Sequence, residues 1–266
     1  MIEIDADFQK KLGSKKAFNY FMGLKGELYR NMNGRKTLRF YMGDDGFFIK
    51  QHFGIGWKEV FKNLSQFKLP VIGAKTEYNA IKFLHSLAVD TMDIVGFSQH
   101  GFNPATIKSF LITKELNSTI SLEDYCVDWP SRPPAFSEKQ LLVREVAGIV
   151  KKMHENGLNH RDLYICHFLM RKSNEVVDNE TPLFVIDLHK AQIRQKVPER
   201  WLIKDLSALY YSAMHIGLTR RDFLRFIKEY RGDSLRKTLE SEVLFWNKVE
   251  KKAHFLDAMP DRKKNT

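Results

Sequence analysis

The sequence predicts an α+β protein with two lobes, a small β-rich lobe at the N-terminus and a helical lobe at the C-terminus. Strand-like segments dominate from residue 26 to Leu116, whereas most periodic segments after Leu116 have helical spacing. Strands come first and helices second, which favours segregated lobes over alternating units. We therefore expect one domain over residues 1–116 and a second over residues 117–266.

The first domain is predicted to contain five strands and one helix. Turn-forming segments separate the first three strands, and Gly43–Gly46 fits a four-residue hairpin connection. Ala80, Ile81, Leu84 and Leu87 recur at helical spacing and predict a helix over 77–87. The predicted strands are 26–32, 37–42, 47–53, 93–100 and 109–116.

The second domain is predicted to be mostly helical. An apolar stripe from Leu141 to Met153 ends near Gly157, a residue type typical of helix ends. Short β-like pieces over 166–170 and 183–187 bracket a polar loop. Two residue pairs have the spacing of an N-terminal helix cap, namely Ser121 with Asp124 and Thr219 with Asp222. Further helices are predicted over 202–216, 219–230 and 241–256.

The composition is that of an ordinary globular protein and excludes wholesale disorder. Hydrophobic residues make up 43% and charged residues 28% of the 266 residues. The 43 Lys and Arg residues exceed the 32 Asp and Glu residues, which gives a formal net charge of +11. We therefore expect an anionic partner, which could be nucleic acid, acidic lipid, a phosphorylated glycan or an acidic protein.

The sequence also indicates a compartment. Cys126 and Cys166 lie far apart and outside any CxxC pair, which disfavours a disulfide scaffold or a structural zinc site. The first residues include acids and lack the cationic and apolar regions of a signal peptide. No apolar run approaches the roughly 20 residues that span a bilayer. We expect a cytoplasmic protein that is still able to attach to a membrane surface.

The most informative segment is His160-Arg161-Asp162-Leu163, between a predicted helix and a short strand. It resembles the catalytic loop of protein kinases, in which the aspartate accepts the proton of the attacking hydroxyl. The alternative is a loop aspartate that caps backbone amides. Asp187 follows an apolar strand, where kinases place a metal-binding aspartate, although aspartate is also a common turn residue.

A candidate nucleotide-binding pair lies in the first domain. Lys50 ends an apolar strand and resembles the kinase lysine that steadies the nucleotide phosphates, with Glu77 on the next helix as its partner. Most strand lysines are merely solvated. However, Lys50, Glu77, Asp162 and Asp187 occur in the order found in kinases, which favours a kinase over chance.

Two features depart from the protein-kinase pattern. Only Gly34 stands where kinases have a glycine-rich phosphate loop, and His167 replaces the metal-binding asparagine. A neutral imidazole can ligate a divalent ion, although Mg²⁺ prefers oxygen. His167 could also orient the substrate or pack structurally.

The chain resembles the lipopolysaccharide core heptose(I) kinase family over nearly its whole length. The resemblance is carried by the segments 159–168, 185–192, 37–40 and 121–126 and by Asn103-Pro104. It implies a Gram-negative enzyme with a protein-kinase-like fold at the cytoplasmic face of the inner membrane. Such an enzyme uses ATP and a divalent metal to phosphorylate the first heptose of the inner core. In this family, a histidine is usual at the position of His167.

The kinase resemblance assigns a role to each candidate residue. Asp162 is the expected catalytic base, Asp187 with His167 the expected Mg²⁺ site, and Lys50 held by Glu77 the expected ATP site. The segment after Asp187 is basic, and inner-core lipopolysaccharide is strongly anionic. We therefore expect the basic side chains of that segment to contact the substrate. The alternative is that they are merely solvated. The substrate-binding candidates are Lys190, Arg194 and Lys196.

Two other functions stay open on sequence grounds. A small-molecule phosphotransferase of the aminoglycoside or choline kinase type shares the aspartates, but a cationic acceptor favours an acidic cleft. A pseudokinase that only binds a partner is suggested by the glycine-poor loop. An acidic protein could use the same basic face, whereas the chain shows no RNA-binding aromatic motif, so no nucleic-acid partner is expected.

Overall fold

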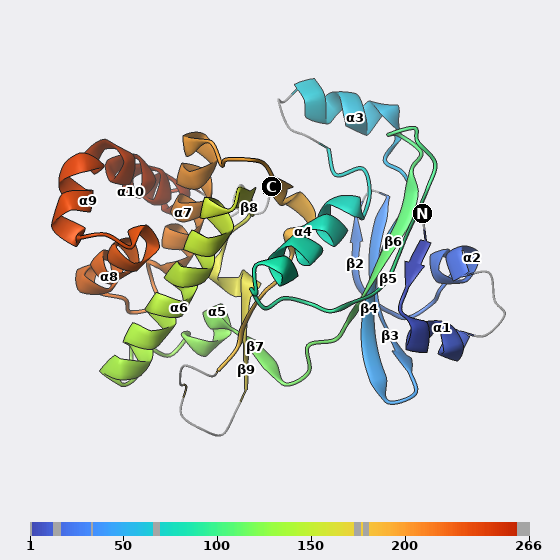
Figure 1. Ribbon diagram of the computed structural model, residues 1–266, viewed down its shortest axis with the longest axis horizontal. Helices are drawn as coiled ribbons and strands as arrows, with labels where there is room; N and C mark the ends of the chain where they lie inside the picture. The colour runs from blue at the N-terminus through green and yellow to red at the C-terminus, as the bar shows by residue number, and fades with distance from the viewer. Residues whose placement is uncertain are drawn as a thin grey trace. The chain divides into compact units, whose positions relative to one another are not determined.

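The structure, a computed structural model, describes residues 2–12, 17–32, 34–65, 70–172, 177 and 181–259 (Figure 1). Backbone contacts divide the chain into two compact units. The N-terminal unit comprises Met1–Phe83, Met92–Leu116 and Leu188–Lys190, and the C-terminal unit comprises Leu84–Thr91, Asn117–Asp187 and Ala191–Thr266. These units differ from the expected domains in two segments. Residues 84–91 belong to the C-terminal unit, and residues 188–190 belong to the N-terminal unit.

A six-stranded antiparallel sheet forms the N-terminal unit, in the order β1-β5-β6-β4-β3-β2. The pairing of β3 and β4 continues to Met42 and Asp45, so their hairpin turns over two residues, not four. Gly43 has a positive φ of 66°. This conformation suits a tight turn. The strands are β1 (Ile2–Ile4), β2 (Glu27–Met32), β3 (Arg35–Met42), β4 (Asp45–His52), β5 (Ile94–His100) and β6 (Lys108–Lys114).

Helices and aromatic side chains complete the N-terminal unit. Its helices are α1 (Ala6–Leu12), α2 (Ala17–Met22), α3 (Gly56–Ser65) and α4 (Lys75–Ser86), of which only α4 is predicted by the periodicity. Phe21 and Phe110 are fully buried, with ring centroids 5.2 Å apart. Phe8 and Phe47 pack into the same core, which fixes β4 and β6 against α1 and α2.

The C-terminal unit is mainly helical, as predicted, and confirms the α+β class. Its small sheets are β10-β9-β7 and β11-β8, and in Figure 1 the helices α7 to α10 lie to one side of α6. The strands are β7 (Thr119–Ser121), β8 (Leu158–Asn159), β9 (Phe168–Arg171), β10 (Leu183–Val185) and β11 (Gln192–Ile193). The helices are α5 (Leu122–Tyr125), α6 (Phe136–Glu155), α7 (Glu199–Ala213), α8 (Arg220–Arg231), α9 (Leu235–Ser241) and α10 (Val243–Asp257).

Both predicted cap pairs are present. The Asp124 amide donates to Ser121 Oγ at 3.0 Å, and Thr219 with Asp222 forms a complete capping box on α8. Gly157 adopts a φ of 86° between α6 and β8. Any side chain there would collide with the carbonyl of Arg194, so the close approach of β8 and β11 requires glycine.

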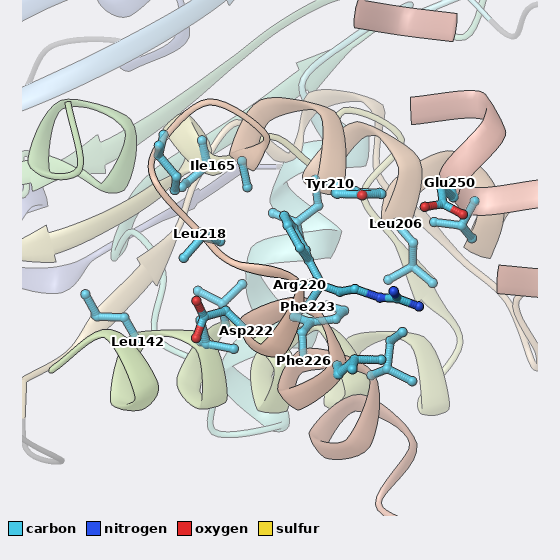
Figure 2. Close-up of a pocket in the computed structure, with 18 of the residues that line it drawn as sticks. Leu142, Ile165, Leu206, Tyr210, Leu218, Arg220, Asp222, Phe223, Phe226 and Glu250 are labelled. Atoms are coloured by element: carbon cyan, nitrogen blue, oxygen red, sulfur yellow. The ribbon is translucent and has the colours of Figure 1, made fainter. Parts of the chain in front are cut away.

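A mainly apolar, partly open cavity of about 540 Å³ lies in the C-terminal unit (Figure 2). Leu142 of α6, Leu206 of α7 and Phe223 of α8 are among the residues that line it. None of the site residues predicted from the sequence lines this cavity. Within the parts of the chain that the structure describes, no helix is both long and apolar enough to cross a membrane.

Candidate phosphoryl-transfer site

One buried carboxylate fixes the backbone of the loop that carries Asp162. The amides of His160 and Arg161 donate to the two Asp205 oxygens, at 2.7 and 2.8 Å. Asp205 lies on α7 and is fully buried. Arg161 has a φ of 73°. Such a conformation costs free energy unless its surroundings hold it, and the Asp205 carboxylate supplies that restraint.

A second layer of hydrogen bonds holds Asp205 in turn. His154 Nε2 lies 3.4 Å from Asp205 Oδ2, and His154 Nδ1 lies 2.9 Å from the Tyr230 hydroxyl oxygen. All three residues are buried, and burial raises the pKa of the Tyr230 hydroxyl above its usual range. A buried polar network whose members are satisfied is rigid. The loop therefore rests on residues from α6, α7 and α8.

His167 joins the two predicted active-site aspartates. Its Nδ1 lies 2.7 Å from the carbonyl oxygen of Asp162, and its Nε2 lies 3.5 Å from Asp187 Oδ2. A carbonyl only accepts hydrogen bonds, so Nδ1 carries a proton, assigned here from the hydrogen bond. In the neutral ring this leaves the Nε2 lone pair beside the Asp187 carboxylate. The Asp162 backbone, the His167 ring and the Asp187 carboxylate thus lie together in the C-terminal unit.

The ring of His160 packs against His167. It is fully buried, it stacks on His167 with ring centroids 5.5 Å apart, and its Nε2 lies 2.9 Å from the Ile186 carbonyl. Burial is the main cause that lowers its pKa, so the ring stays neutral. Asp187 itself has a φ of 60°, so the backbone on both sides of the site holds an unusual conformation.

A metal ion at this site would have two protein ligands. Among the described residues, no group of three or more His, Cys, Asp or Glu side chains is arranged to hold a metal ion. Mg²⁺ in phosphoryl-transfer sites is commonly held by one or two side chains, with water and substrate phosphates completing the shell. The Asp187 carboxylate beside the His167 lone pair fits that mode.

The N-terminal unit contains the predicted lysine–glutamate pair. The Lys50 ammonium on β4 lies 2.5 Å from Glu77 Oε1 on α4. The Glu77 side chain is 2% exposed and the Lys50 side chain 25%. The buried carboxylate therefore holds the ammonium group in place, while part of the lysine reaches solvent. His52, two residues further along β4, is also buried, and this burial, with the charges of Arg35 and Lys50, lowers its pKa to about 3.

The predicted substrate-binding cations belong to both units of the chain. Lys190 ends a short 3-10 helix that belongs to the N-terminal unit, whereas Arg194 and Lys196 follow β11 in the C-terminal unit. Arg194 donates to Asn159 Oδ1 at 2.5 Å and to Gln192 Oε1. Lys196 is exposed. Arg194 is thus held next to the loop that carries Asp162.

Comparisons with known proteins place this site in a family. The profile of the "Lipopolysaccharide kinase (Kdo/WaaP) family" matches residues 19–230. The chain belongs to this family. The resemblance found in the sequence is thereby confirmed, and a kinase family implies the use of ATP, generally with a divalent metal.

Individual relatives of this family are similar over nearly their whole length. The chain is 46% identical to "Lipopolysaccharide core heptose(I) kinase WaaP" of Escherichia coli K12, over 99% of both chains. It is 45% identical to the protein of the same name from Pseudomonas aeruginosa, over 95% of this chain and 94% of that one. A solved structure, "WaaP in complex with acyl carrier protein", superposes with a TM-score of 0.84 at 39% identity and covers 96% of this chain and 98% of that one. The protein-kinase-like α+β fold is thus confirmed.

Sequence reasoning missed Asp205, His154 and Tyr230. The available signal was the aspartate in the mostly apolar segment 201–209, since a charged residue on a buried helix face needs partners. Its partners are backbone amides, which carry no sequence signature.

Proposed function

We propose that this protein transfers the γ-phosphate of ATP to a hydroxyl of the first heptose of the lipopolysaccharide inner core. The observation that carries the proposal is the His167 ring between the Asp162 backbone and the Asp187 carboxylate. The names of the relatives, which are 45% to 46% identical over nearly the full chain, support the acceptor.

Each polar group of the site has a role in this reaction. Asp162 orients the sugar hydroxyl in line with the phosphate and accepts its proton. Asp187, with His167, binds Mg²⁺, which when bound offsets negative charge on the β- and γ-phosphates. Lys50, held by Glu77, binds the nucleotide phosphates. Asp205 keeps the backbone of the Asp162 loop in its functional conformation.

The basic residues serve the acceptor and its surroundings in this proposal. Lys190, Arg194 and Lys196 contact anionic groups of the inner core. The net charge of +11 also favours peripheral binding to the anionic cytoplasmic face of the inner membrane. Each cation near the surface contributes about 1 kcal/mol to such binding. The same charge suits an acidic protein partner, and one solved relative forms a complex with acyl carrier protein.

The direct test is phosphate transfer to a defined acceptor. Purified protein is incubated with ATP, Mg²⁺ and dephosphorylated inner core, and the new phosphate is located by mass spectrometry. Aminoglycosides and choline serve as alternative acceptors, and an ATP-binding measurement accompanies each assay. Phosphate on the first heptose supports the proposal. Transfer only to the small cations, or ATP binding with no transfer to any acceptor, would refute it.

A further inference from the structure

Four cationic side chains surround the indole of Trp201 in the C-terminal unit. The distances from the charged groups to the ring centroid are 4.9 Å for Arg161, 5.9 Å for Arg194, 5.3 Å for Arg200 and 5.7 Å for Lys204. We call these five residues the Trp201 cluster. Arg194 is one of the predicted substrate contacts, whereas the sequence assigns no such role to Arg200, Trp201 or Lys204.

Three chain segments bring the Trp201 cluster together. Arg161 precedes Asp162 in the loop after β8. Arg194 follows β11, the strand that pairs with β8. The other three residues of the cluster lie on the first turns of α7. Trp201 and Asp205 are four residues apart on α7 and so share one helix face. Asp205 holds the backbone amide of Arg161, and Trp201 holds its guanidinium. The cluster is therefore attached directly to the catalytic loop.

The cluster concentrates positive charge around one aromatic ring. Arg194 donates to the neutral side chains of Asn159 and Gln192. Burial lowers the pKa of the Arg194 guanidinium, and the charges of Arg161 and Arg200 lower it further. Two nearby carboxylates have other partners, because Asp205 accepts from the loop amides and Glu199 lies 2.8 Å from Lys248, whereas Asp162 acts electrostatically on Arg161. Such an arrangement of like charges attracts an anion.

Two buried donors in the cluster also lack an acceptor. Among the described residues, Arg161 Nε and Trp201 Nε1 are shielded from solvent and have no hydrogen-bond partner. Buried N–H groups are rarely left without an acceptor, because the loss of hydration is costly. An anionic oxygen in this place would accept from such donors. The N-terminus of α7, where Arg200 and Trp201 lie, adds a favourable helix dipole.

We propose that the Trp201 cluster is an anion site that binds the carboxylate of an acidic sugar next to the heptose that receives phosphate. This inference rests on the proposed function and deepens it by naming what the acceptor must carry. Guanidinium groups match a planar carboxylate and bind it with paired hydrogen bonds. Because Arg161 adjoins Asp162, a carboxylate bound there positions the neighbouring sugar at the base. A phosphate of the lipid part has similar chemistry and is the competing source.

The first experiment measures steady-state kinetics with Arg200→Gln. Arg200 is exposed in the first turn of α7, so its loss should leave the fold intact, as circular dichroism can verify. We expect the KM for the inner core to rise about tenfold, as for the loss of one charge-assisted contact, with kcat and the KM for ATP little changed. The control is Arg236→Gln on α9, which removes an 89% exposed arginine that pairs with its helix neighbour Glu240. Such exposed pairs contribute little, so neither parameter should change.

The acceptor is varied in parallel to identify the anion. With carboxyl-reduced inner core, the unmodified protein should show the raised KM, and Arg200→Gln should add nothing further. If removal of the lipid phosphates abolishes the effect of Arg200→Gln and carboxyl reduction does not, the carboxylate assignment is wrong. An unchanged KM for Arg200→Gln overturns the anion site, whereas failure of the unmodified protein to phosphorylate the core overturns the proposed function.

The second experiment reads binding without catalysis. Free Kdo, a sugar acid that carries a carboxylate, is titrated while tryptophan fluorescence is recorded, and inorganic phosphate forms a separate arm. We expect saturable quenching by Kdo that is lost in Trp201→Phe and weakened about tenfold in Arg200→Gln. Quenching by phosphate alone, or Kdo quenching that persists in Trp201→Phe, contradicts the proposal. Mass spectrometry also tests whether the chain itself carries a phosphorylated residue. The proposal would be contradicted if phosphatase treatment removed both that phosphate and the quenching.

Discussion

The imidazole Nε2 of His167 lies 3.5 Å from the Asp187 carboxylate, while the other nitrogen of the ring is held by the Asp162 carbonyl. The carbonyl fixes which nitrogen carries the proton, so the orientation of the ring depends on the backbone of the catalytic loop. One side chain therefore links the proposed base and the proposed metal ligand. A change in the backbone of the loop that carries Asp162 should therefore reach the Asp187 carboxylate through this ring.

We expect His167→Asn to shift the metal preference of the protein. An imidazole suits Mn²⁺ or Co²⁺ better than Mg²⁺, whereas an amide oxygen is a harder ligand that suits Mg²⁺. The ratio of activity with Mn²⁺ to activity with Mg²⁺ should fall in the variant, by about tenfold when an inner ligand is replaced. The measurement is metal-dependent phosphate transfer at saturating ATP. An unchanged ratio, with the overall rate lowered equally for both metals, would show that His167 positions the loop and does not ligate.

Asp162→Asn should abolish most transfer and leave the fold intact. The amide keeps the shape of the side chain and one acceptor oxygen, but it does not accept the sugar proton. The loss of a positioned general base lowers kcat by about 10²- to 10⁴-fold. ATP affinity, measured by calorimetry, should stay within about twofold, since Asp162 is not assigned to the nucleotide. A variant that retains more than about a tenth of kcat would remove Asp162 from the role of base.

The sequence predicts regular elements well where periodicity and caps coincide. The helix around Leu141–Met153 and the cap pairs at Ser121 and Thr219 are found in the structure. The short helices α1, α2 and α3 and the three-residue strand β1 are not predicted, because their burial depends on partners distant in sequence. The hairpin after Met42 is tighter than predicted, since the pairing of β3 and β4 continues into the turn segment.

The candidate site shows a similar division. Residues that recur in order along kinase sequences, such as Lys50 and Glu77, are found paired as expected. Asp205 acts through backbone amides, and the Trp201 cluster is assembled from three segments far apart in sequence. Neither arrangement leaves a local pattern. Sequence reasoning thus finds groups that carry a known motif and misses those that hold the motif in place.

Lys50→Met should weaken ATP binding and also destabilise the N-terminal unit. The change leaves the buried Glu77 carboxylate without its ammonium partner. Removal of one partner from a buried pair typically costs about 3–5 kcal/mol, and we expect the lower end of that range because Lys50 is partly exposed. The double variant Lys50→Met/Glu77→Leu should recover much of the stability but not ATP binding. Recovery of both would show that the pair is structural, and thermal unfolding with ATP titration separates these outcomes.

The folded protein should lose stability as the pH falls below about 6.5, partly because of His52. Burial, aided by the charges of Arg35 and Lys50, lowers the pKa of this side chain from 6.5 to about 3 in the folded chain. The unfolded chain therefore binds the proton more tightly, and between these pH values each pH unit of acidification costs up to about 1.4 kcal/mol. At higher pH both states are neutral and the effect vanishes. Denaturant unfolding at several pH values should show a shallower slope in His52→Gln than in the unmodified protein.

The matched control for His52 is His215→Gln. The His215 side chain is 75% exposed and lies 2.9 Å from Asp257. Because exposed pairs of this kind contribute little, its removal should leave the pH slope almost unchanged. If His52→Gln and the unmodified protein have equal slopes over the acidic range, another group governs acid unfolding. His160 is the next candidate, because burial also lowers its pKa.

Asp205→Asn tests whether the buried carboxylate controls the catalytic loop. One amide oxygen remains to accept from a loop amide, but the second oxygen becomes an NH₂ group that faces a backbone N–H, so one buried hydrogen bond is lost. The left-handed conformation of Arg161 then loses part of its restraint. We expect kcat to fall by about 10²-fold, as for a loss of precise positioning, with a smaller change in the KM for ATP.

Stability provides the second readout for Asp205, which is fully buried. A donor left unpaired in the core costs about 1–3 kcal/mol, so denaturant unfolding should shift without loss of the cooperative transition. Tyr230→Phe removes only the outer hydrogen bond to His154 and should lower kcat much less than Asp205→Asn does. If Asp205→Asn reduces stability while kcat of the folded fraction is unchanged, the carboxylate stabilises the fold without positioning Asp162.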